Sequence, residues 1–547
     1  MGKRRRRQAL ARSRAIAPMG KRESSCCQQD GDGDTQAGKV KRDLIPELPE
    51  DIWCHIHSLM PLRDAACAAC VSRAFLRSWR CHPNLIFNAD MFRSKTHMYR
   101  GNYGDIVDRI IRKHSGAGVK ILKLELFASI YSKNLDSWLE VAVTPGIEVL
   151  TFRLCRFRKK YNFPCSVLSS RVRNSIRNLE FDFCAFRPTA DLGPLRSLTS
   201  LCLRYVRITG DELECFLSNS LALMQLELKK CKEIICLNIP CVLQQFSYLS
   251  VFCCRNLRVI ESKAPNLKSL HISGNVKLSL GEALQMKNIW LDRSEVVCYS
   301  RVELPSILPN LETLYISSRG EVVNTPSMPT KFVYLKHLTI CFILLGGPFS
   351  PSYDYFSLVS FLDASPSLET LILNVPQGQM QQESVFQHSS HFRQMTEHHH
   401  CHLKRVTITA FSSAKSLVEL TCHILKSALS LECLTLVPIY GSRCSDGITM
   451  RCYTPDKSVL KEVPKAFAAI RKYIEGMVRP TVELTVVEPC SRCHGNEGCD
   501  AESTWNDTQE CEIIDENLTQ APSQEDIFNM IKEMRGNAAR LHLVLMV

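Results

Sequence analysis

Two cysteines near the start of the chain, Cys67 and Cys70, have the CxxC spacing found in zinc and redox sites. His55 and His57 precede them and are candidates to complete a set of metal ligands. Positions i and i+3 also share one face of a helix, where a small apolar residue such as cysteine fills core space. We therefore expect both cysteines to pack on a helix face, and a metal or redox site is the alternative.

A second group of sulfur ligands lies near the other end of the chain. Cys490, Cys493 and His494 form a CxxCH sequence, and Cys499 follows closely. Haem attachment would need an export and maturation system that nothing in the sequence indicates. A loop of free cysteines is the favoured interpretation, and zinc binding by these residues stays open.

Two polar motifs fall in expected loops. The sequence EHHHCH, residues 397–402, could hold transition metals adventitiously, but it lies in an insertion and is interpreted as solvated. The basic and aromatic sequence RFRKKY, residues 156–161, could contact phosphate or RNA, and a solvated loop or a contact for an acidic protein is favoured. The sequence predicts no metal site and no cofactor.

The formal net charge of +13 is concentrated in one segment. Nine positive charges and no acidic residue lie within residues 2–22, so the rest of the chain is nearly balanced at +4. A nucleic-acid partner is therefore disfavoured, and a location in the nucleus, the cytoplasm or both is expected. A polyanion contact, a solvated arm or a transit peptide are alternatives to nuclear import. The residues that would form the import signal are Lys3, Arg4, Arg5, Arg6 and Arg7.

The 27 cysteines would suggest a disulfide framework if the protein were secreted. The sequence QALARSRAIAPM, however, lacks the uninterrupted apolar core of a signal peptide. The apolar run CFILLGG, residues 341–347, falls far short of the roughly 18 to 20 residues that span a bilayer. We expect reduced cysteines in a soluble, intracellular protein with no membrane partner.

A repeat dominates the chain from residue 119 onward. Apolar residues recur at i, i+3 and i+5, and a cysteine, asparagine or other small or apolar residue often follows at i+8. In a short strand, i+3 and i+5 point into the core, and i+8 turns inward where the chain leaves the strand. Successive matches start 19 to 35 residues apart, mostly within the roughly 20 to 29 residues of leucine-rich repeats.

One such unit cannot bury its apolar face alone, so the units should stack into a solenoid with parallel strands. A set of unrelated βα units is the alternative. The first match places Ile121, Leu124 and Leu126 in the core, and the sixth places Leu243, Phe246 and Tyr248 there. All matches start at Ile121, Ile147, Ile176, Leu198, Leu223, Leu243, Leu267, Met286, Leu311, Leu335, Leu368, Leu403 and Leu431.

Residues 48–79, LPEDIWCHIHSLMPLRDAACAACVSRAFLRSW, show dense helical patterning. Pro49 and two following acidic residues favour a helix start, and Ile52, Ile56 and Leu59 form an apolar stripe at spacings of four and three. A break follows, with Asp64 placed to cap the next helix. Three short helices are expected, and their apolar surface is too large for so small a unit to hide without a partner.

This segment resembles the F-box motif of plant F-box proteins in its leading Leu-Pro, its acidic pair, its Pro-Leu-Arg-Asp turn and its Val-Ser-Arg followed by Trp. Residues 119–440 resemble the leucine-rich repeats that commonly follow it. The sequences SPSLETLILNV and HLKRVTITAF, with residues 456–476 and 481–493, resemble the C-terminal region of plant, especially grass, F-box/leucine-rich-repeat proteins, including those with an FBD-type ending. Cys67 stands where the family often has a basic residue. The resemblance implies a face that docks a Skp-family adaptor, formed or supported by Leu48, Pro49, Ile52, Ile56, Leu59, Leu62, Val71 and Trp79.

The predicted fold class is α/β, with a small all-helical F-box-like motif, a leucine-rich-repeat solenoid of parallel strands with helices or irregular turns, and a small α/β C-terminal cap. The predicted domains are a disordered basic tail (1–43), the F-box-like motif (44–90), a linker or capping segment (91–118), the solenoid (119–440), an FBD-like cap (441–500) and an acidic, partly disordered tail (501–547).

The resemblance implies a non-catalytic substrate adaptor of an SCF-type cullin-RING E3 ubiquitin ligase. Its expected partners are the Skp-family adaptor, through it the cullin and RING subunits, and a protein substrate of unknown identity bound by the solenoid. No phosphate-cradling glycine loop or nucleophile-base pair can be assigned, so no catalytic residue is predicted. The alternatives are a nuclear scaffold or RNA-associated protein that works without a ligase, and a co-receptor whose solenoid binds a small molecule.

Overall fold

The computed structural model describes residues 49–70, 73–88, 103–115, 118–126, 134–154, 161–189, 192–281, 284–343, 353–375, 383–387, 392–393, 398–439 and 457–488. By its internal contacts the chain divides after Pro49, and the helices and strands described here all lie in the unit that begins at Glu50.

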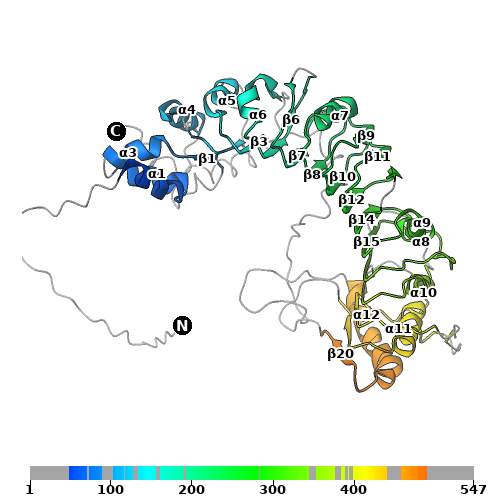
Figure 1. Ribbon diagram of the computed structural model, residues 1–547. Helices are drawn as coiled ribbons and strands as arrows, with labels where there is room; N and C mark the ends of the chain where they lie inside the picture. Colours follow the sequence, from blue (N-terminus) through cyan, green and yellow to red (C-terminus); the bar gives the residue numbers. More distant parts are fainter. Residues whose placement is uncertain are drawn as a thin grey trace, which may run out of the picture. The chain divides into compact units, whose positions relative to one another are not determined.

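Three short helices open this unit, namely α1 (Glu50–Ser58), α2 (Leu62–Ala69) and α3 (Arg73–Arg80) (Figure 1). The helix α2 begins directly after Pro61, whose φ of −56° already suits a helix entry. Asp64 lies inside the first turn of α2, and no side chain caps this helix. The prediction that Asp64 caps the second helix was therefore wrong, because Pro61 takes the N-cap position three residues earlier.

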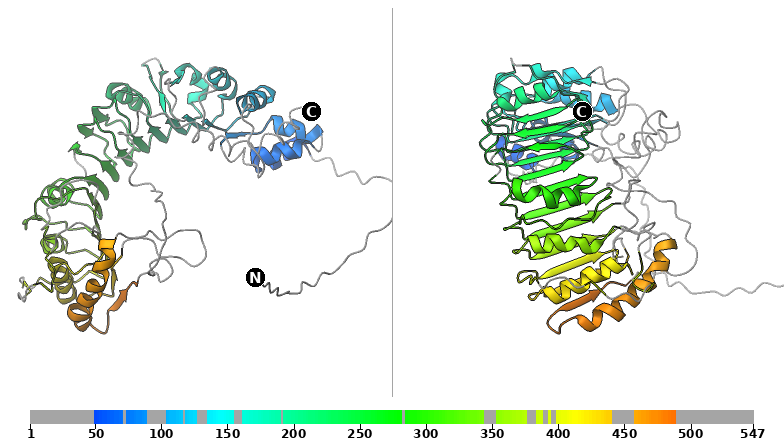
Figure 2. Two further views of the ribbon diagram at one scale, coloured as in Figure 1. Left: turned by 180° about the vertical axis from the view of Figure 1, so that it is seen from behind. Right: turned by 90° about the vertical axis from the view of Figure 1, so that its right-hand side faces the viewer.

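Within the described residues, fifteen strands form one sheet in which every pairing is parallel, and they lie side by side as successive rungs (Figure 2). In spatial order the strands are β1 (Asn84–Phe87), β2 (Ile121–Leu126), β3 (Val149–Leu154), β5 (Asn178–Asp182), β7 (Ser200–Arg204), β8 (Gln225–Lys229), β10 (Tyr248–Phe252), β12 (Ser269–Ser273), β14 (Asn288–Arg293), β15 (Thr313–Ser318), β16 (His337–Phe342), β17 (Thr370–Asn374), β18 (Arg405–Thr409), β19 (Cys433–Val437) and β20 (Glu483–Val486).

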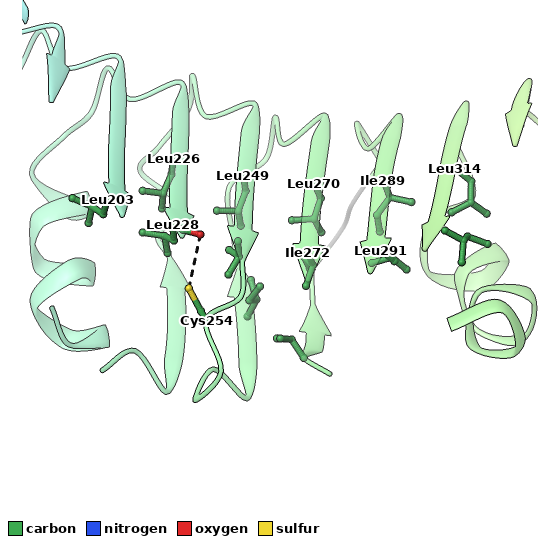
Figure 3. Close-up of a cluster of buried hydrophobic side chains, with 14 of the residues drawn as sticks. Leu203, Leu226, Leu228, Leu249, Cys254, Leu270, Ile272, Ile289, Leu291 and Leu314 are labelled. Atoms are coloured by element: carbon green, nitrogen blue, oxygen red, sulfur yellow. Dashed lines mark hydrogen bonds between the residues drawn. The ribbon is translucent and has the colours of Figure 1, made fainter. Parts of the chain in front are cut away.

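The spatial order of these strands follows the chain order, as stacked repeats require. Leu226, Leu249 and Leu270 are paired in register across neighbouring strands and are completely buried (Figure 3). Burying a leucine side chain contributes about 1.5–3 kcal/mol, and buried leucine, isoleucine or valine side chains recur in the strands of this sheet from β1 to β19. The predicted α/β fold with a parallel-stranded solenoid is therefore confirmed.

The thirteen predicted repeats correspond to the strands from β2 to β19, but two were placed in the wrong register. In β2, Leu122 and Leu124 pair with Leu150 and Phe152, so they occupy the positions i+3 and i+5. Ile121 is therefore not the first core residue of this repeat, and it is only partly buried. In β10 the buried residues are Leu249 and Val251, and Tyr248 points to the opposite face. Two further strands, β1 and β20, extend the sheet beyond residues 119–440.

One backbone feature recurs where strands end. A residue with positive φ follows the strand in several repeats, at Phe183, Tyr205, Lys230, Cys253 and Gly274. After the first four the next residue is buried, as predicted for Cys184, Val206 and Cys231 and as observed also for Cys254. After Gly274 the prediction was wrong, because Asn275 is exposed and Val276 is the buried residue. The Cys231 thiol donates to the carbonyl oxygen of Leu203 at 3.4 Å, and the Cys254 thiol donates to that of Leu228 at 3.8 Å (Figure 3). A small thiol thus fills the turn and satisfies a backbone acceptor.

Shorter elements connect the rungs. Two small parallel sheets are formed by β9 (Cys236–Ile239), β11 (Val259–Ser262) and β13 (Lys277–Ser279), and by β4 (Tyr161–Asn162) and β6 (Cys184–Ala185). The connecting helices are α4 (Tyr103–Lys113), α5 (Leu135–Ala142), η3 (Cys165–Val167), α6 (Ser170–Arg173), α7 (Gly210–Ser218), α8 (Val296–Val302), α9 (Leu304–Ile307), η5 (Tyr355–Leu358), α10 (Val359–Ala364), α11 (Lys415–Ser427), α12 (Lys457–Ala469), η6 (Ile470–Ile474) and η7 (Glu475–Met477).

The helix α7 shows how closely a repeat is fitted together. Thr209 and Glu212 form a capping box, in which each side chain accepts a hydrogen bond from the other residue's backbone amide. A Cβ atom at Gly210 would lie 2.3 Å from the carbonyl oxygen of Cys236 in β9, so only glycine permits this approach. In the described part of the chain, no helix has the length and apolar character needed to cross a membrane.

Candidate partner-binding surfaces

The helix α1 presents three large apolar side chains to solvent. Ile52, Ile56 and Leu59 are 40%, 37% and 74% exposed. Ile52 and Ile56 are four residues apart in α1, and Leu59 follows three residues later, just after the helix ends. This spacing places them along one side, as the sequence predicted. We call these three residues the apolar face of α1. Contiguous exposed apolar residues of this kind mark interaction sites.

The other side of α1 packs against α3. The rings of Trp53 and Phe75 are 4.6 Å apart, and the rings of His57 and Phe75 are 5.2 Å apart, both in edge-on arrangements. His57 is buried, and its Nδ1 atom hydrogen-bonds the carbonyl oxygen of Trp53 at 3.0 Å. The contact with α3 thus uses Trp53 and His57, and it leaves the apolar face of α1 uncovered.

The other predicted docking residues fall into three groups. Leu62 in α2 and Trp79 in α3 are buried in the core of the helical segment, so they support it from within. Pro49 is exposed immediately before α1. Leu48 and Val71 lie outside the described residues, as do Lys3, Arg4, Arg5, Arg6 and Arg7.

A buried histidine joins the helical segment to the first strand of the sheet. The backbone amide of Asn84 donates to His82 Nδ1 at 3.1 Å, so Nε2 carries the proton and donates to the carbonyl oxygen of Met60 at 3.2 Å. Asn84 also donates to the carbonyl oxygen of Ser58 at 3.2 Å. Burial lowers the pKa of His82, which favours the neutral ring that these bonds require.

Cys67 and Cys70 do not fill core space, so that prediction was wrong. Both are exposed free thiols, whereas the buried face of α2 consists of Leu62 and the alanines Ala65, Ala66 and Ala69. Cys67 is two residues from Ala65, and two residues rotate a helix by about 200°, which turns this position outward. Among the described residues, no group of three or more His, Cys, Asp or Glu side chains is arranged to hold a metal ion.

The remaining chemical motifs are only partly described. In the histidine-rich insertion, His398 and His399 are exposed, but His400 is buried with its Nε2 atom 3.8 Å from Asp363 Oδ1. Burial and the nearby His423 lower the pKa of His400 to about 4, so it is a neutral core residue. Tyr161 donates to Asp136 at 2.5 Å, whereas residues 155–160 and the group Cys490, Cys493, His494 and Cys499 lie outside the described residues.

A second surface lies on the solvent-facing side of the sheet. Tyr248, His271, Trp290 and Tyr315 come from the consecutive strands β10, β12, β14 and β15. Their neighbouring ring centroids are 5.2, 5.2 and 4.7 Å apart, each pair edge-on. The parallel register places His271 opposite Trp290, and Trp290 opposite Tyr315, which aligns the rings across the strands. We call this set the aromatic row.

The charges beside the aromatic row are unequally compensated. At one side, Asp292 accepts bonds of 3.0 and 2.6 Å from Arg319, so its charge is closely paired. At the β8 end, the Glu227 side chain is 44% exposed and its ion-pair contact with Arg204 is long, at 3.9 Å. Arg204 lies much closer to Glu180 than to Glu227. Glu227 therefore retains a negative charge that is open to solvent.

Sequence reasoning did not identify the aromatic row. Its members lie 19 to 25 residues apart along the chain, and the register error in β10 assigned Tyr248 to the core. An alignment of the repeats in their observed register would have shown aromatic residues at i+4 in three successive repeats, at His271, Trp290 and Tyr315.

Comparisons with known proteins identify two domains in this chain. The family described as "At1g61320/AtMIF1, LRR domain" matches residues 110–491, which is more than half of the chain. The family described as "F-box domain" matches residues 45–87, the segment that contains α1, α2 and α3.

Several proteins of Arabidopsis thaliana are similar to this chain. The putative F-box protein At3g58950 is 26% identical over 20% of this chain and 26% of its own length. The putative FBD-associated F-box protein At5g56400 is 24% identical over 43% of this chain and 52% of its own, and the F-box/LRR-repeat protein At4g14096 is 22% identical over 60% and 73%. The chain thus spans about a quarter and about half of the first two relatives.

One solved structure with a likeness is the LRR ectodomain of the plant membrane receptor kinase GASSHO1/SCHENGEN3 from Arabidopsis thaliana in complex with CASPARIAN STRIP INTEGRITY FACTOR 2. It is 16% identical, and the match covers 59% of this chain and 45% of that one with a TM-score of 0.20. A TM-score this low does not establish a shared fold, so the repeat architecture is inferred from the strand pairing of this chain alone.

Proposed function

Because the chain belongs to the plant F-box/leucine-rich-repeat family, we propose that it is the substrate-recognition adaptor of an SCF-type cullin-RING E3 ubiquitin ligase. In this role the helical segment binds a Skp-family adaptor, and through it the cullin and RING subunits. The solenoid binds the protein substrate. The chain itself performs no chemistry, since it only raises the effective concentration of substrate lysines near the ubiquitin-loaded enzyme.

The observation that carries this proposal is the exposed apolar face of α1 within the segment that matches the F-box domain. A helix in a packed unit ordinarily buries its large apolar side chains, and α1 already uses Trp53 and His57 for its contact with α3. Ile52, Ile56 and Leu59 are left to face a partner. The basic run Lys3–Arg7 supports a location in the nucleus, the cytoplasm or both.

The test is capture of a purified Skp-family adaptor by the full chain and by the double variant Ile52→Asp, Ile56→Asp. Both side chains are exposed, so the fold should tolerate the change, but two carboxylates at an apolar interface should weaken binding at least about 100-fold. The matched control is Leu221→Asp, which alters an exposed leucine in the solenoid and should leave capture unchanged.

Equal capture by the double variant and the unaltered chain would contradict this role for α1, and so would an absence of capture by the unaltered chain. Circular dichroism of each protein separates a loss of binding from a loss of fold. Proteins that accumulate only with the double variant, and bind it, would be candidates for the substrate.

A further inference from the structure

The aromatic row has the dimensions of a peptide-binding site. It crosses four adjacent strands, which lie about 4.8 Å apart, so it extends for about 14 Å, the length of about four residues of extended chain. Trp290 is 40% exposed at its centre. The edge-on stacking of the rings fixes their orientation without a partner, so a ligand would lose little entropy in ordering them.

The charge at the end of the row favours a cationic ligand. Glu227 in β8 is paired in register with Ser250, the residue that lies opposite His271 in the next strand. The nearby Lys229 ammonium group is already held over the Phe252 ring at 5.5 Å, and Asp292 is closely paired with Arg319. The electrostatic effect of Glu227 reaches the row itself, because its charge raises the pKa of Tyr248 in addition to the larger effect of burial.

We propose that Glu227, Tyr248, His271, Trp290 and Tyr315 bind arginine side chains presented by an extended segment of the protein that the solenoid recognises, with one guanidinium group on the rings and another on the Glu227 carboxylate. Aromatic ring faces attract guanidinium groups, which are planar and can stack, and a carboxylate at the end of the row can accept two parallel hydrogen bonds. This inference rests on the proposed function only in assigning the segment to a ubiquitination substrate.

The experiment measures binding of a capped octapeptide of alternating serine and arginine to the full chain by calorimetry. In an extended peptide this alternation places every arginine on one side. The matched probe replaces each arginine with citrulline, which keeps the size and removes the charge. We expect the arginine peptide to bind at least about 10-fold more tightly than the citrulline peptide, although the chain as a whole carries a net charge of +13.

Two variants assign the binding to the row. Trp290→Leu should weaken the arginine peptide about 3- to 30-fold, and Glu227→Gln should weaken it about 3- to 10-fold. Glu432→Gln, which removes an exposed acidic charge far along the sheet beside β19, should have no effect. Tyr315→Leu gives a second test of the rings if Trp290→Leu does not fold.

Equal binding of the two peptides would overturn the proposal, as would arginine-peptide binding that none of the row variants changes. Tighter binding of a proline-rich octapeptide would also overturn it, because an uncharged aromatic groove would then be the better description. Adaptor capture by α1 is measured separately with the Ile52→Asp, Ile56→Asp variant. A failure of the peptide test alone leaves the ligase role standing, and a failure of capture alone leaves the row as a binding site.

Discussion

The helical segment and the sheet treat apolar side chains in opposite ways. On α1, Ile52 and Ile56 are exposed although they have the spacing of a core-facing stripe. On the sheet, alternate apolar residues of successive strands are buried because each rung is covered by its neighbours. The solenoid therefore completes its own core, whereas the helical segment leaves a face uncovered. The same apolar pattern in a sequence can thus indicate stability in one region and binding in another.

Truncating one leucine in each region tests this difference directly. Leu226→Ala removes a fully buried side chain from β8 and should lower the free energy of unfolding by about 2–5 kcal/mol. Leu59→Ala removes a side chain that is 74% exposed and should change it by less than about 0.5 kcal/mol, while weakening adaptor capture. Urea unfolding of both variants checks the difference. A large destabilisation by Leu59→Ala would show that α1 belongs to the core of the unit.

The periodicity of the sequence was sufficient to predict the stacked parallel strands, because thirteen repeats had to agree. It was not sufficient for the register of single repeats. Around β10, the triplets Leu243-Phe246-Tyr248 and Phe246-Leu249-Val251 both satisfy the spacing i, i+3 and i+5. They differ by three residues, and an odd slip exchanges the two faces of a strand. The burial of neighbouring strands decides between them, and this information is not local.

The candidate sites show the same limit. The apolar face of α1 was predicted because its residues are close in sequence, so a helical period alone brings them together. The aromatic row depends on residues in four repeats and on the correct register of β10, which no single segment specifies. The prediction that Cys67 and Cys70 lie in the core was wrong because Leu62 and the alanines Ala65, Ala66 and Ala69 form the buried face of α2.

A low pH should affect the two regions differently. Protonation of His400 should lower the free energy of unfolding of the solenoid, whereas Ile52, Ile56 and Leu59 carry no group that titrates. The pKa of His400 is lowered to about 4, against about 6.5 in the unfolded chain. Its contribution is fully present above pH 6.5 and is lost as the pH falls toward 4, because the unfolded state then binds the additional proton. We expect a loss of about 1–3 kcal/mol over this range in urea unfolding.

Two variants isolate the effect of His400 from that of other groups. His400→Gln should reduce the pH dependence, whereas His398→Gln removes only one of the smaller charges that lower the pKa of His400 and should reduce the dependence much less. Asp363, His423, His398 and His399 also act on this site, so the His400 variant should remove the dependence only in part. An unchanged slope in His400→Gln would assign the acid sensitivity to other buried groups, such as His82.

The smallest expected effect concerns the same residue type in the two regions. Cys67 and Cys70 are exposed, whereas Cys231 is buried at a strand end and its thiol donates to the carbonyl oxygen of Leu203. The hydrogen bond with the neighbouring Cys254, together with burial, holds the pKa of Cys231 well above its usual value, so its thiolate is scarce as well as shielded. The double variant Cys67→Ser, Cys70→Ser should therefore change the free energy of unfolding by less than about 0.5 kcal/mol, and EDTA should not alter this free energy.

Labelling with iodoacetamide tests the same difference in exposure. Iodoacetamide should modify Cys67 and Cys70 in the folded protein and reach Cys231 only on unfolding, as mass spectrometry of digested samples would show. If a chelator unfolded residues 50–80, these cysteines would be metal ligands, and the helical segment would depend on a bound ion as well as on a protein partner.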